Sequence, residues 1–331
     1  MQLALTTASA PPSERAYNAK HSWSQRQGII LTAQDHLGNC VRSEAAPLPA
    51  YSPDTFDDAL RWLQQAQPQH YPDPATSGLA RLLAVLRKTA DSAPASARFG
   101  FDFAFLQLAA KRQSVPLRKL LNPACKAPSR RVSARLLDLH RSDLAQQLER
   151  FSATAVPAVK VKLGRSLPTE LQALELVRRH LPDVALRADA NGAWSYEQGM
   201  AALSELQVFG LELLEEPFRL DSAPPAEQVP PLPLPIAWDE SLFQRNPQDA
   251  QLLEWLGRED CRALILKPMC LGGCERLQQW VQTASSTTCE VIFSHVFDGS
   301  YAAHIYSELA AAWGSRTLAM GLGQQSEHLP W

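Results

Sequence analysis

The amino-acid sequence predicts an α/β protein: a (β/α)7β modified TIM barrel with an N-terminal α+β capping domain. From residue 131 onward, short apolar segments alternate with helical patterns, which is typical of parallel strands joined by crossover helices. Five of these segments end in charged residues that recur every 24 to 29 positions, about the length of one strand, one helix and two loops. Residues 1–100 instead show two strands followed by two helices, so we expect two domains.

The capping domain is expected to span residues 1–100. Two segments with strand character flank a turn-rich connection at 35–38. Two amphipathic helical patterns follow, and Ser77 is placed to cap the second. A bulky helix at 99–112 then leads into the barrel. The expected strands span 26–34 and 39–46, and the expected helices span 55–66 and 77–89.

The barrel, residues 101–322, is expected to contain eight parallel strands joined by seven right-handed crossovers with helical patterns. No segment after the eighth strand is long enough for another barrel helix, and we expect residues 323–331 to pack back on the capping domain. The proline-rich stretch 224–235 is interpreted as a loop, because a strand pattern resumes at once. The strands are expected at 132–137, 156–162, 184–189, 211–215, 234–239, 263–267, 290–294 and 317–322, and the helices include 170–179, 196–206, 247–256, 274–283 and 301–313.

Lysines end the second and the sixth of these strands. Lys160 and Lys162 are two residues apart and therefore share one face of their strand. Their repulsion and partial burial should lower a lysine pKa toward neutrality and make one amine a usable base. The alternative is a pair of solvated lysines on an amphipathic strand. Lys267 should lie across the barrel mouth from them.

Acidic residues end the three strands between these lysines. They are Asp189, one of Glu215 and Glu216, and one of Asp239 and Glu240, since the strand pattern does not decide the inward member of each pair. Three carboxylates at such distances cannot all stay ionised without a cation. Hard oxygen ligands favour Mg²⁺, with Mn²⁺ as the second candidate. The alternative is a set of acids that cap helices or pair with arginines.

Two polar residues flank Asp189 on its own face of the strand. Arg187 is placed to act as a charge partner of Asp189 one layer deeper in the barrel, and Asn191 is placed to act as a polar supporting group above it. With lysines on opposite faces of a metal-bound carboxylate, the pattern predicts proton transfer at its α-carbon, where the metal would stabilise the resulting enediolate.

Five motifs together resemble the enolase superfamily, in its muconate-lactonizing-enzyme subgroup: KVK at 160–162, LRADAN at 186–191, LLEEP at 213–217, IAWDES at 236–241 and ILKP at 265–268. The resemblance extends over about residues 26–322. Lysine bases beside Mg²⁺ are a property of that superfamily. Position by position, it implies Asp189, Glu215 and Asp239 as metal ligands, Lys162 as acid/base, Lys160 as its modulator and Lys267 as the facing lysine. Contacts to the substrate, or support of the residues named above, are expected from Arg187, Asn191, Glu240, Ser294 and His295.

Within the subgroup, segments 43–49, 236–241 and 291–298 look most like those of enzymes that form 2-succinylbenzoate. This implies a syn-dehydration of 2-succinyl-6-hydroxy-2,4-cyclohexadiene-1-carboxylate in menaquinone or phylloquinone biosynthesis, with loops at 17–23 and 47–51 covering the barrel mouth. His295 and Asp298 depart from many relatives and leave the substrate contacts open. A racemase of N-acylamino acids or an epimerase of dipeptides would use the same residues. Muconate cycloisomerisation and a non-catalytic binding barrel are further alternatives.

Composition restricts the partners and the compartment. The net charge of −2 gives no sign of attraction to nucleic acid or membrane, and no apolar run approaches the roughly 18 residues of a membrane span. The first ten residues lack the basic flank of a signal peptide. Six cysteines without a CxxC pair are expected to be reduced thiols in a cytoplasmic protein. The expected partner is a small-molecule carboxylate substrate, and the oligomeric state stays open.

Overall fold

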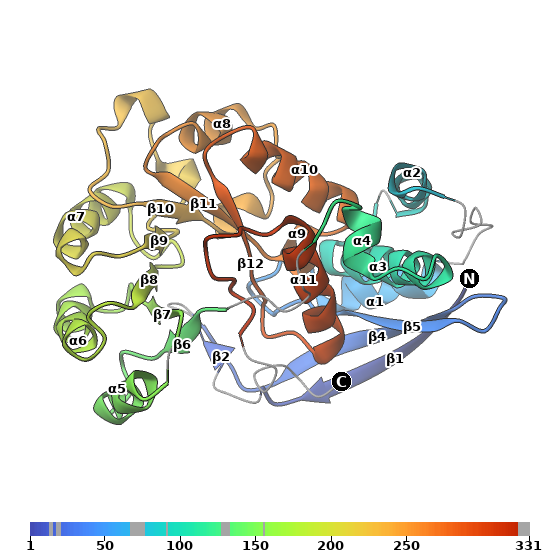
Figure 1. Cartoon of the computed structure of the whole chain (residues 1–331), viewed down its shortest axis with the longest axis horizontal. Coiled ribbons are helices and arrows are strands. Elements are labelled where there is room, and N and C mark those ends of the chain that lie inside the picture. Colours follow the sequence, from blue (N-terminus) through green and yellow to red (C-terminus); the bar gives the residue numbers. More distant parts are fainter. Residues whose placement is uncertain are drawn as a thin grey trace.

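A computed structural model describes residues 1–12, 16–17, 21–66, 77–90, 92–126, 133–154 and 156–323. In these ranges an antiparallel N-terminal sheet lies beside a curled parallel sheet that is covered by helices (Figure 1). The predicted C-terminal return at 324–331 and part of the predicted loop at 17–23 lie outside the described residues. None of the helices in the described ranges combines the length and the hydropathy needed to cross a bilayer.

The N-terminal sheet consists of three strands in the order β1-β4-β5, with β1 at Gln2–Ala10, β4 at Arg26–Gln34 and β5 at Cys40–Ala45. β4 and β5 confirm the two predicted strands. β1 was not predicted, because its apolar residues are interspersed with small polar ones and its own strand signal is weak. All of β1 pairs with β4, so hydrogen bonds to the neighbouring strand stabilise β1 although its own strand propensity is weak. β2 (Ala16–Tyr17) and β3 (Ser22–Trp23) form a separate two-stranded ladder.

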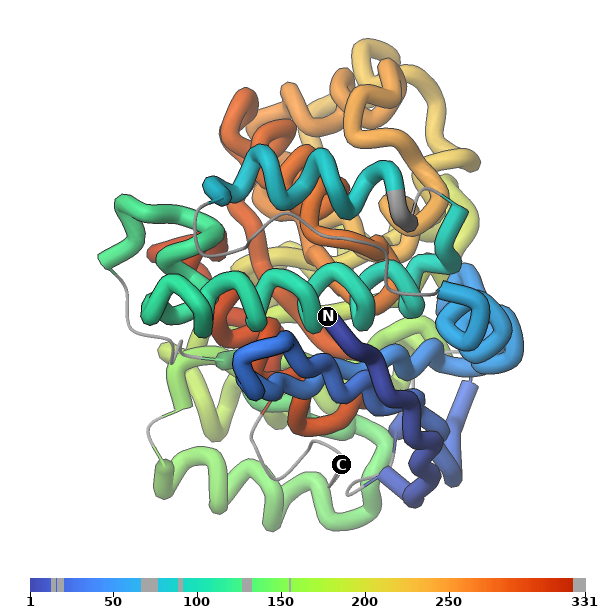
Figure 2. The backbone as a smooth tube through the Cα atoms, turned by 90° about the vertical axis from the view of Figure 1, so that its right-hand side faces the viewer, coloured from blue at the N-terminus to red at the C-terminus, as the bar shows by residue number. Residues whose placement is uncertain are grey.

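Three helices accompany this sheet: α1 (Phe56–Gln65), α2 (Leu79–Ala90) and α3 (Ala95–Arg112). α1 begins after Thr55, whose hydroxyl accepts a hydrogen bond from the Asp58 N–H at 3.2 Å. α3 is buried along most of its length, since it packs against β4 and β5 and also against α9 (Pro268–Leu271) of the barrel. Figure 2 shows α3 between α2 and the N-terminal sheet. The domain boundary predicted near residue 100 therefore falls inside a helix that contacts both domains.

Seven parallel strands follow one another in the barrel sheet in chain order: β6 (Arg135–Leu137), β7 (Ala158–Lys162), β8 (Ala185–Asp189), β9 (Leu213–Glu215), β10 (Ile236–Trp238), β11 (Cys261–Leu266) and β12 (Glu290–Phe293). The predicted eighth strand is reduced to two bridges, from Met320 to Ser133 and from Gly321 to Ser294. Two backbone hydrogen bonds of 2.8 Å accompany them, from the Ala134 N–H to the Met320 carbonyl and from the Gly321 N–H to the Phe293 carbonyl. These contacts join the two edges of the sheet and close the barrel.

Helices cover the outer face of the barrel (Figure 1): α5 (Leu144–Ser152), α6 (Leu167–His180), α7 (Tyr196–Leu206), α8 (Ala250–Leu256), α10 (Cys274–Ser285) and α11 (Ser300–Trp313), with the short α4 (Leu117–Leu121) beside α11. The connection from β9 to β10 corrects the prediction of seven helical crossovers. It contains only two 3-10 turns, η2 (Leu220–Ser222) and η3 (Ala226–Gln228). Six prolines lie between 224 and 235, and proline lacks the N–H that a helix interior requires.

Side chains inside the barrel form layers along the strand direction. Leu213, Ala237 and Ile265 belong to one buried apolar cluster. Two residues after each of them the chain carries Glu215, which ends β9, and Asp239 and Lys267, which directly follow β10 and β11. Since strand residues two apart share a face, the apolar layer supports a charged layer at the carboxyl ends of the strands.

Candidate active site

Three carboxylates meet at the carboxyl end of the barrel. Asp189 ends β8, Glu215 ends β9, and Asp239 directly follows β10. One oxygen of each lies within 4.8 Å of the others, and all three residues are buried. The parallel register, in which Asp189 lies opposite Glu215, produces this arrangement. We call these three residues the acid triad.

Three lysines surround the acid triad. The Lys160 Nζ lies 3.0 Å from the Asp189 Oδ2 and also donates to Glu215. The Lys162 Nζ donates to the Asp189 Oδ2 at 2.8 Å. The Lys267 Nζ donates to Asp239 from the opposite side of the barrel mouth. All six charged side chains that the sequence predicted at the strand ends are therefore brought together.

The electrostatics of Lys160 differ from the prediction. Burial lowers the pKa of Lys160, but Asp189 and Glu215 outweigh it and raise the pKa above its ordinary value. The expectation that burial and lysine repulsion lower the pKa was therefore wrong for Lys160, because the charges of the neighbouring carboxylates outweigh both effects. Burial likewise lowers the pKa of Lys267, and Asp239 and Glu240 raise it above its usual range.

The acid triad fits a divalent cation. The Oδ1 atom of Asp239 is buried and has no hydrogen-bond partner among the described residues. Burial, followed by the charge of Glu240, raises the pKa of Asp239 well above its ordinary value although Lys267 opposes the shift. An unpaired buried carboxylate oxygen beside two further carboxylates is a costly arrangement unless a cation is bound. Oxygen ligands on rigid strand ends suit a hard divalent ion.

The neighbouring acids have other partners, which resolves the choice left open by the strand pattern. Glu216 has a φ of 40°, so its side chain turns away from the triad. It accepts hydrogen bonds of 2.9 Å from the backbone N–H groups of Asp239 and Ser241. Glu240 instead accepts hydrogen bonds at its Oε1 from Tyr51 at 2.6 Å and from Asn191 at 2.9 Å. Glu215 and Asp239 are thus the inward members of their pairs.

The two polar residues that flank Asp189 lie at different depths. The Asn191 Oδ1 accepts a hydrogen bond from Lys162 at 3.2 Å, at the level of the lysines. Arg187 lies one layer below, where its guanidinium donates to Glu212 and, at 2.6 Å, to the Ala319 carbonyl. Arg187 therefore connects β8 with the segment that closes the barrel, and its contribution to catalysis stays a prediction.

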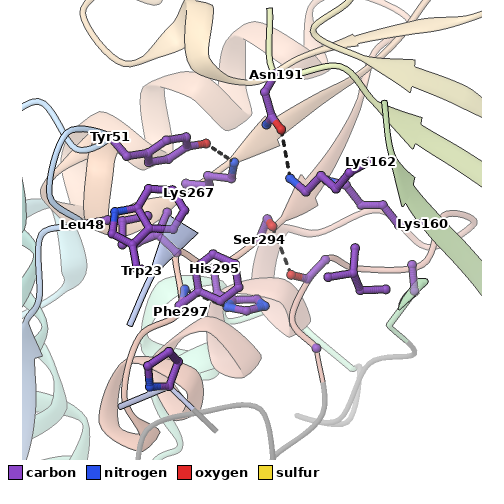
Figure 3. A pocket seen from close by; sticks show the side chains of 16 residues that line it. Trp23, Leu48, Tyr51, Lys160, Lys162, Asn191, Lys267, Ser294, His295 and Phe297 are labelled. Carbon is purple, nitrogen blue, oxygen red and sulfur yellow. Dashed lines mark hydrogen bonds between the residues drawn. The ribbon is translucent and has the colours of Figure 1, made fainter. Parts of the chain in front are cut away.

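A cavity of about 110 Å³ opens beside the lysines (Figure 3). Lys160, Lys162, Lys267 and Asn191 form its barrel side. The N-terminal domain contributes Trp23, Leu48 and Tyr51, and the loop after β12 contributes Ser294 through Phe297. Trp23 and Tyr51 were predicted only as parts of covering loops. Their single sequence signal is an aromatic residue within a segment expected to cover the barrel mouth.

The unusual residues after β12 separate into two environments. The ring of His295 lines the cavity, and its Nδ1 accepts a hydrogen bond from the Phe297 N–H at 3.1 Å. Asp298 is instead fully buried, and it accepts hydrogen bonds from Tyr306 at 2.8 Å and from the Val296 N–H at 3.0 Å. His295 is therefore placed to meet a ligand, whereas Asp298 holds the loop.

Residues 143–326 match the family described as enolase C-terminal domain-like. The chain belongs to this family. The barrel, the strand-end acids and the facing lysines are the features that the resemblance to the enolase superfamily predicted, and the superfamily assignment is confirmed.

The proteins that are similar to this chain carry the names of two different activities. An o-succinylbenzoate synthase of Geobacillus stearothermophilus is 31% identical over 75% of this chain and 65% of its own length, so the chain spans somewhat less than two thirds of that relative. The L-Ala-D/L-Glu epimerase of Bacillus subtilis has a similar fold, with a TM-score of 0.79, 18% identity and coverage of 97% of this chain and 88% of its own. The o-succinylbenzoate synthase of Thermosynechococcus elongatus BP-1, complexed with Mg, has a TM-score of 0.73 and 22% identity. The match covers 100% of this chain and 95% of the synthase chain. At these identities the two solved structures show the fold alone.

Proposed function

We propose that this protein is an o-succinylbenzoate synthase, a carbon–oxygen hydro-lyase that dehydrates 2-succinyl-6-hydroxy-2,4-cyclohexadiene-1-carboxylate to 2-succinylbenzoate. The observation that carries the proposal is the asymmetry of the two facing lysines. Lys162 donates to Asn191 and Asp189 beside the cavity, whereas Lys267 donates to Asp239 and Tyr51 and lies 4.9 Å from the Tyr51 ring centroid. A lysine held in this way is suited to act as a fixed positive charge. The sequence similarity to a synthase gives further support.

The acid triad would hold the metal ion, for which we propose Mg²⁺, with Mn²⁺ as a substitute. When bound, the ion would supply positive charge beside the carboxylate of the substrate and so favour loss of the adjacent proton. Lys160, which contacts Asp189 and Glu215, would modulate the charge of this ligand set and of Lys162.

In the proposed reaction Lys162 is the single acid/base. Its neutral amine removes the α-proton, and the C–H electron pair moves into an enediolate whose negative charge faces the ammonium of Lys267. Lys162, now protonated, gives the proton to the leaving hydroxyl on the same face. The C–O bond breaks, water departs and the ring becomes aromatic. Trp23, Leu48 and Tyr51 cover the cavity and limit access of bulk water.

The second candidate is a racemase of N-acylamino acids or an epimerase of dipeptides. One observation favours it: the amines of Lys162 and Lys267 line the same cavity from β7 and from the end of β11. In that case each lysine would act as a base on its own face of the substrate. The two proposals therefore share their residues and differ in the role of Lys267.

The deciding experiment combines dehydration with isotope exchange. The cyclohexadiene substrate is followed by absorbance in the presence of Mg²⁺, and N-succinylamino acids are followed by polarimetry in deuterated water. A synthase should dehydrate the first substrate. It should exchange the α-proton of a slow analogue through Lys162 only, and this exchange should persist in Lys267→Ala. Exchange on both faces with rapid inversion, without dehydration, would establish the racemase and contradict the synthase. On the synthase proposal, the enzyme would act in the cytoplasm in menaquinone or phylloquinone biosynthesis.

A further inference from the structure

A chain of hydrogen bonds links the two facing lysines without passing through the acid triad. The Lys162 Nζ donates to the Asn191 Oδ1 at 3.2 Å, and the Asn191 Nδ2 donates to the Glu240 Oε1 at 2.9 Å. The Tyr51 hydroxyl donates to the same Glu240 oxygen at 2.6 Å and accepts from the Lys267 Nζ. Figure 3 shows both ends of this chain, at Asn191 and at Tyr51. We call Asn191, Glu240 and Tyr51 the lysine bridge.

The lysine bridge takes its members from different parts of the fold. Asn191 follows β8 with a φ of 48°, and Glu240 begins the turn after β10, so the barrel fixes both. Tyr51 comes from the segment between β5 and α1, which belongs to the predicted capping domain. Lys267 also lies 3.9 Å from the Glu240 Oε1 as an ion pair, but the hydrogen-bonded route between the two lysines is complete only when the N-terminal segment lies over the barrel mouth.

Tyr51 is held in one orientation by aromatic neighbours. Its ring meets the ring of Phe243 edge-on at 5.5 Å and the ring of Trp23 edge-on at 6.2 Å. The Trp23 indole N–H in turn donates to the Pro49 carbonyl at 2.9 Å, two residues before Tyr51. With its ring held in this way, the hydroxyl stays directed at Lys267 and Glu240.

We propose that Tyr51 is a positioning residue that sets the geometry of both lysines: directly for Lys267, and through Glu240 and Asn191 for Lys162. The bonds that carry this role are made to side chains of the protein, so they exist before any substrate arrives. Substrate that enters beneath the covering segment would meet two amines already aligned. The consequence for turnover rests on the proposed function, whereas the alignment of the lysines does not.

The matched variants are Tyr51→Phe, which keeps the ring and removes only the hydroxyl, and Tyr301→Phe as control. The Tyr301 hydroxyl accepts a hydrogen bond from the exposed Arg42 and lies outside the cavity lining. We expect Tyr51→Phe to lower kcat about tenfold with less than a threefold change in KM, since a lost hydrogen bond to a charged group has about this effect on a rate. Tyr301→Phe should leave both values unchanged.

A double-mutant cycle tests the coupling along the bridge. If Tyr51 acts on Lys162 through Glu240 and Asn191, then Tyr51→Phe in an Asn191→Ala background should cost about threefold less in kcat than it does alone. Additive effects, or an effect of Tyr51→Phe confined to KM, would overturn the proposal and leave Tyr51 as a wall of the cavity.

A second measurement does not depend on turnover. Trace acetylation of the folded protein, quantified for each lysine by peptide mass spectrometry, reports the reactivity of each amine, which rises with its accessibility and its unprotonated fraction. Tyr51→Phe should raise labelling of both Lys162 and Lys267 at least about twofold, whereas the peripheral Lys111 stays unchanged as internal control. Unchanged labelling of Lys162 would overturn the proposal. If Tyr51→Phe raises the labelling as expected but the parent enzyme does not dehydrate the cyclohexadiene, the proposed function alone is contradicted.

Discussion

Among the buried charges of the described residues, two clusters have different surroundings. The strand-end cluster consists of the acid triad with Lys160, Lys162 and Lys267. The interdomain cluster consists of Arg26, Glu44, Asp298 and Tyr306, where β4 and β5 meet the loop after β12. Arg26, Glu44 and Asp298 are fully buried, whereas the side chains of Lys160 and Lys162 keep 15% and 14% of their exposure and line the cavity.

The interdomain cluster owes its organisation to backbone groups from both domains. The Arg26 guanidinium donates to the carbonyls of Ala46 and Pro47 on one side, and to those of Val296 and Phe297 on the other, at 2.7 to 3.3 Å. The Gly299 N–H donates to Glu44 at 2.6 Å. Backbone groups hold fixed positions in the fold, so they provide lasting hydrogen-bond partners for these buried side chains, which is typical of a structural role. The strand-end cluster instead pairs carboxylates with lysine side chains beside the cavity, where a bound cation or substrate could replace these partners.

The largest expected effect breaks the strand-end cluster. Asp189→Asn, Glu215→Gln and Asp239→Asn should each lower activity by about a thousandfold or more, because each removes charge from one shared cation site. The free energy of unfolding should fall for Asp189→Asn, because Lys160 and Lys162 pair with this carboxylate and, against the effect of burial, lower its pKa. It should change little or rise for Asp239→Asn, because burial and the charge of Glu240 disfavour the ionised form of Asp239. Steady-state rates and denaturant titration measure the two effects. Full activity of EDTA-treated protein without added metal would show that the site is wrongly assigned.

The corresponding change in the interdomain cluster should act on stability. Arg26→Met should lower the free energy of unfolding by about 3–5 kcal/mol, because it leaves Asp298 without its charged partner and four carbonyls without a donor. Arg42→Met on the neighbouring strand, where the arginine is exposed, should cost no more than about 0.5 kcal/mol. A loss of activity at unchanged melting temperature would place Arg26 with the active site instead.

A pH titration sharpens the difference further. Burial, followed by the charge of Asp298, raises the pKa of Glu44 from 4.5 to about 8. Below pH 4.5 the carboxyl is protonated in the folded and unfolded states. Between about pH 4.5 and 8 only the unfolded state ionises, so stability falls as the pH rises. Glu44→Gln should remove this fall, a gain of a few kcal/mol at pH 8 relative to pH 5. Denaturant curves of both proteins at the two pH values test it, and parallel losses would contradict it.

The smallest expected effect concerns Arg187, which lies below the strand-end cluster and belongs to neither set. Arg187→Met should lower the free energy of unfolding by about 1–3 kcal/mol, since it removes the bonds to Glu212 and to the Ala319 carbonyl. Turnover should fall several-fold in a protein that stays folded, because Gly321 of the same closing segment lines the cavity. Unchanged turnover together with a large fall in melting temperature would make Arg187 purely structural.

Local patterns predicted the barrel because each strand carries its own evidence. Apolar runs that end in a charge define β7 to β11, and α7 has the predicted bounds of 196–206 because a capping box at Ser195 fixes its start. The patterns failed where another segment supplies the stability. β1 depends on its pairing with β4, and the eighth strand on two bridges to the sheet edges.

The amino-acid sequence suffices to predict the set of charged strand ends, because the spacing of parallel strands and their two-residue period bring Asp189, Glu215 and Lys267 to one face. The electrostatics of that face and the position of Tyr51 depend on the folded structure, because they arise from contacts between residues that are far apart in the sequence. The pKa of Lys160 follows from carboxylates on two other strands, and the Tyr51 hydroxyl meets Lys267 across 216 residues of chain. The Tyr51 contact arises from packing of the N-terminal segment over the barrel, which leaves no periodic trace in the sequence.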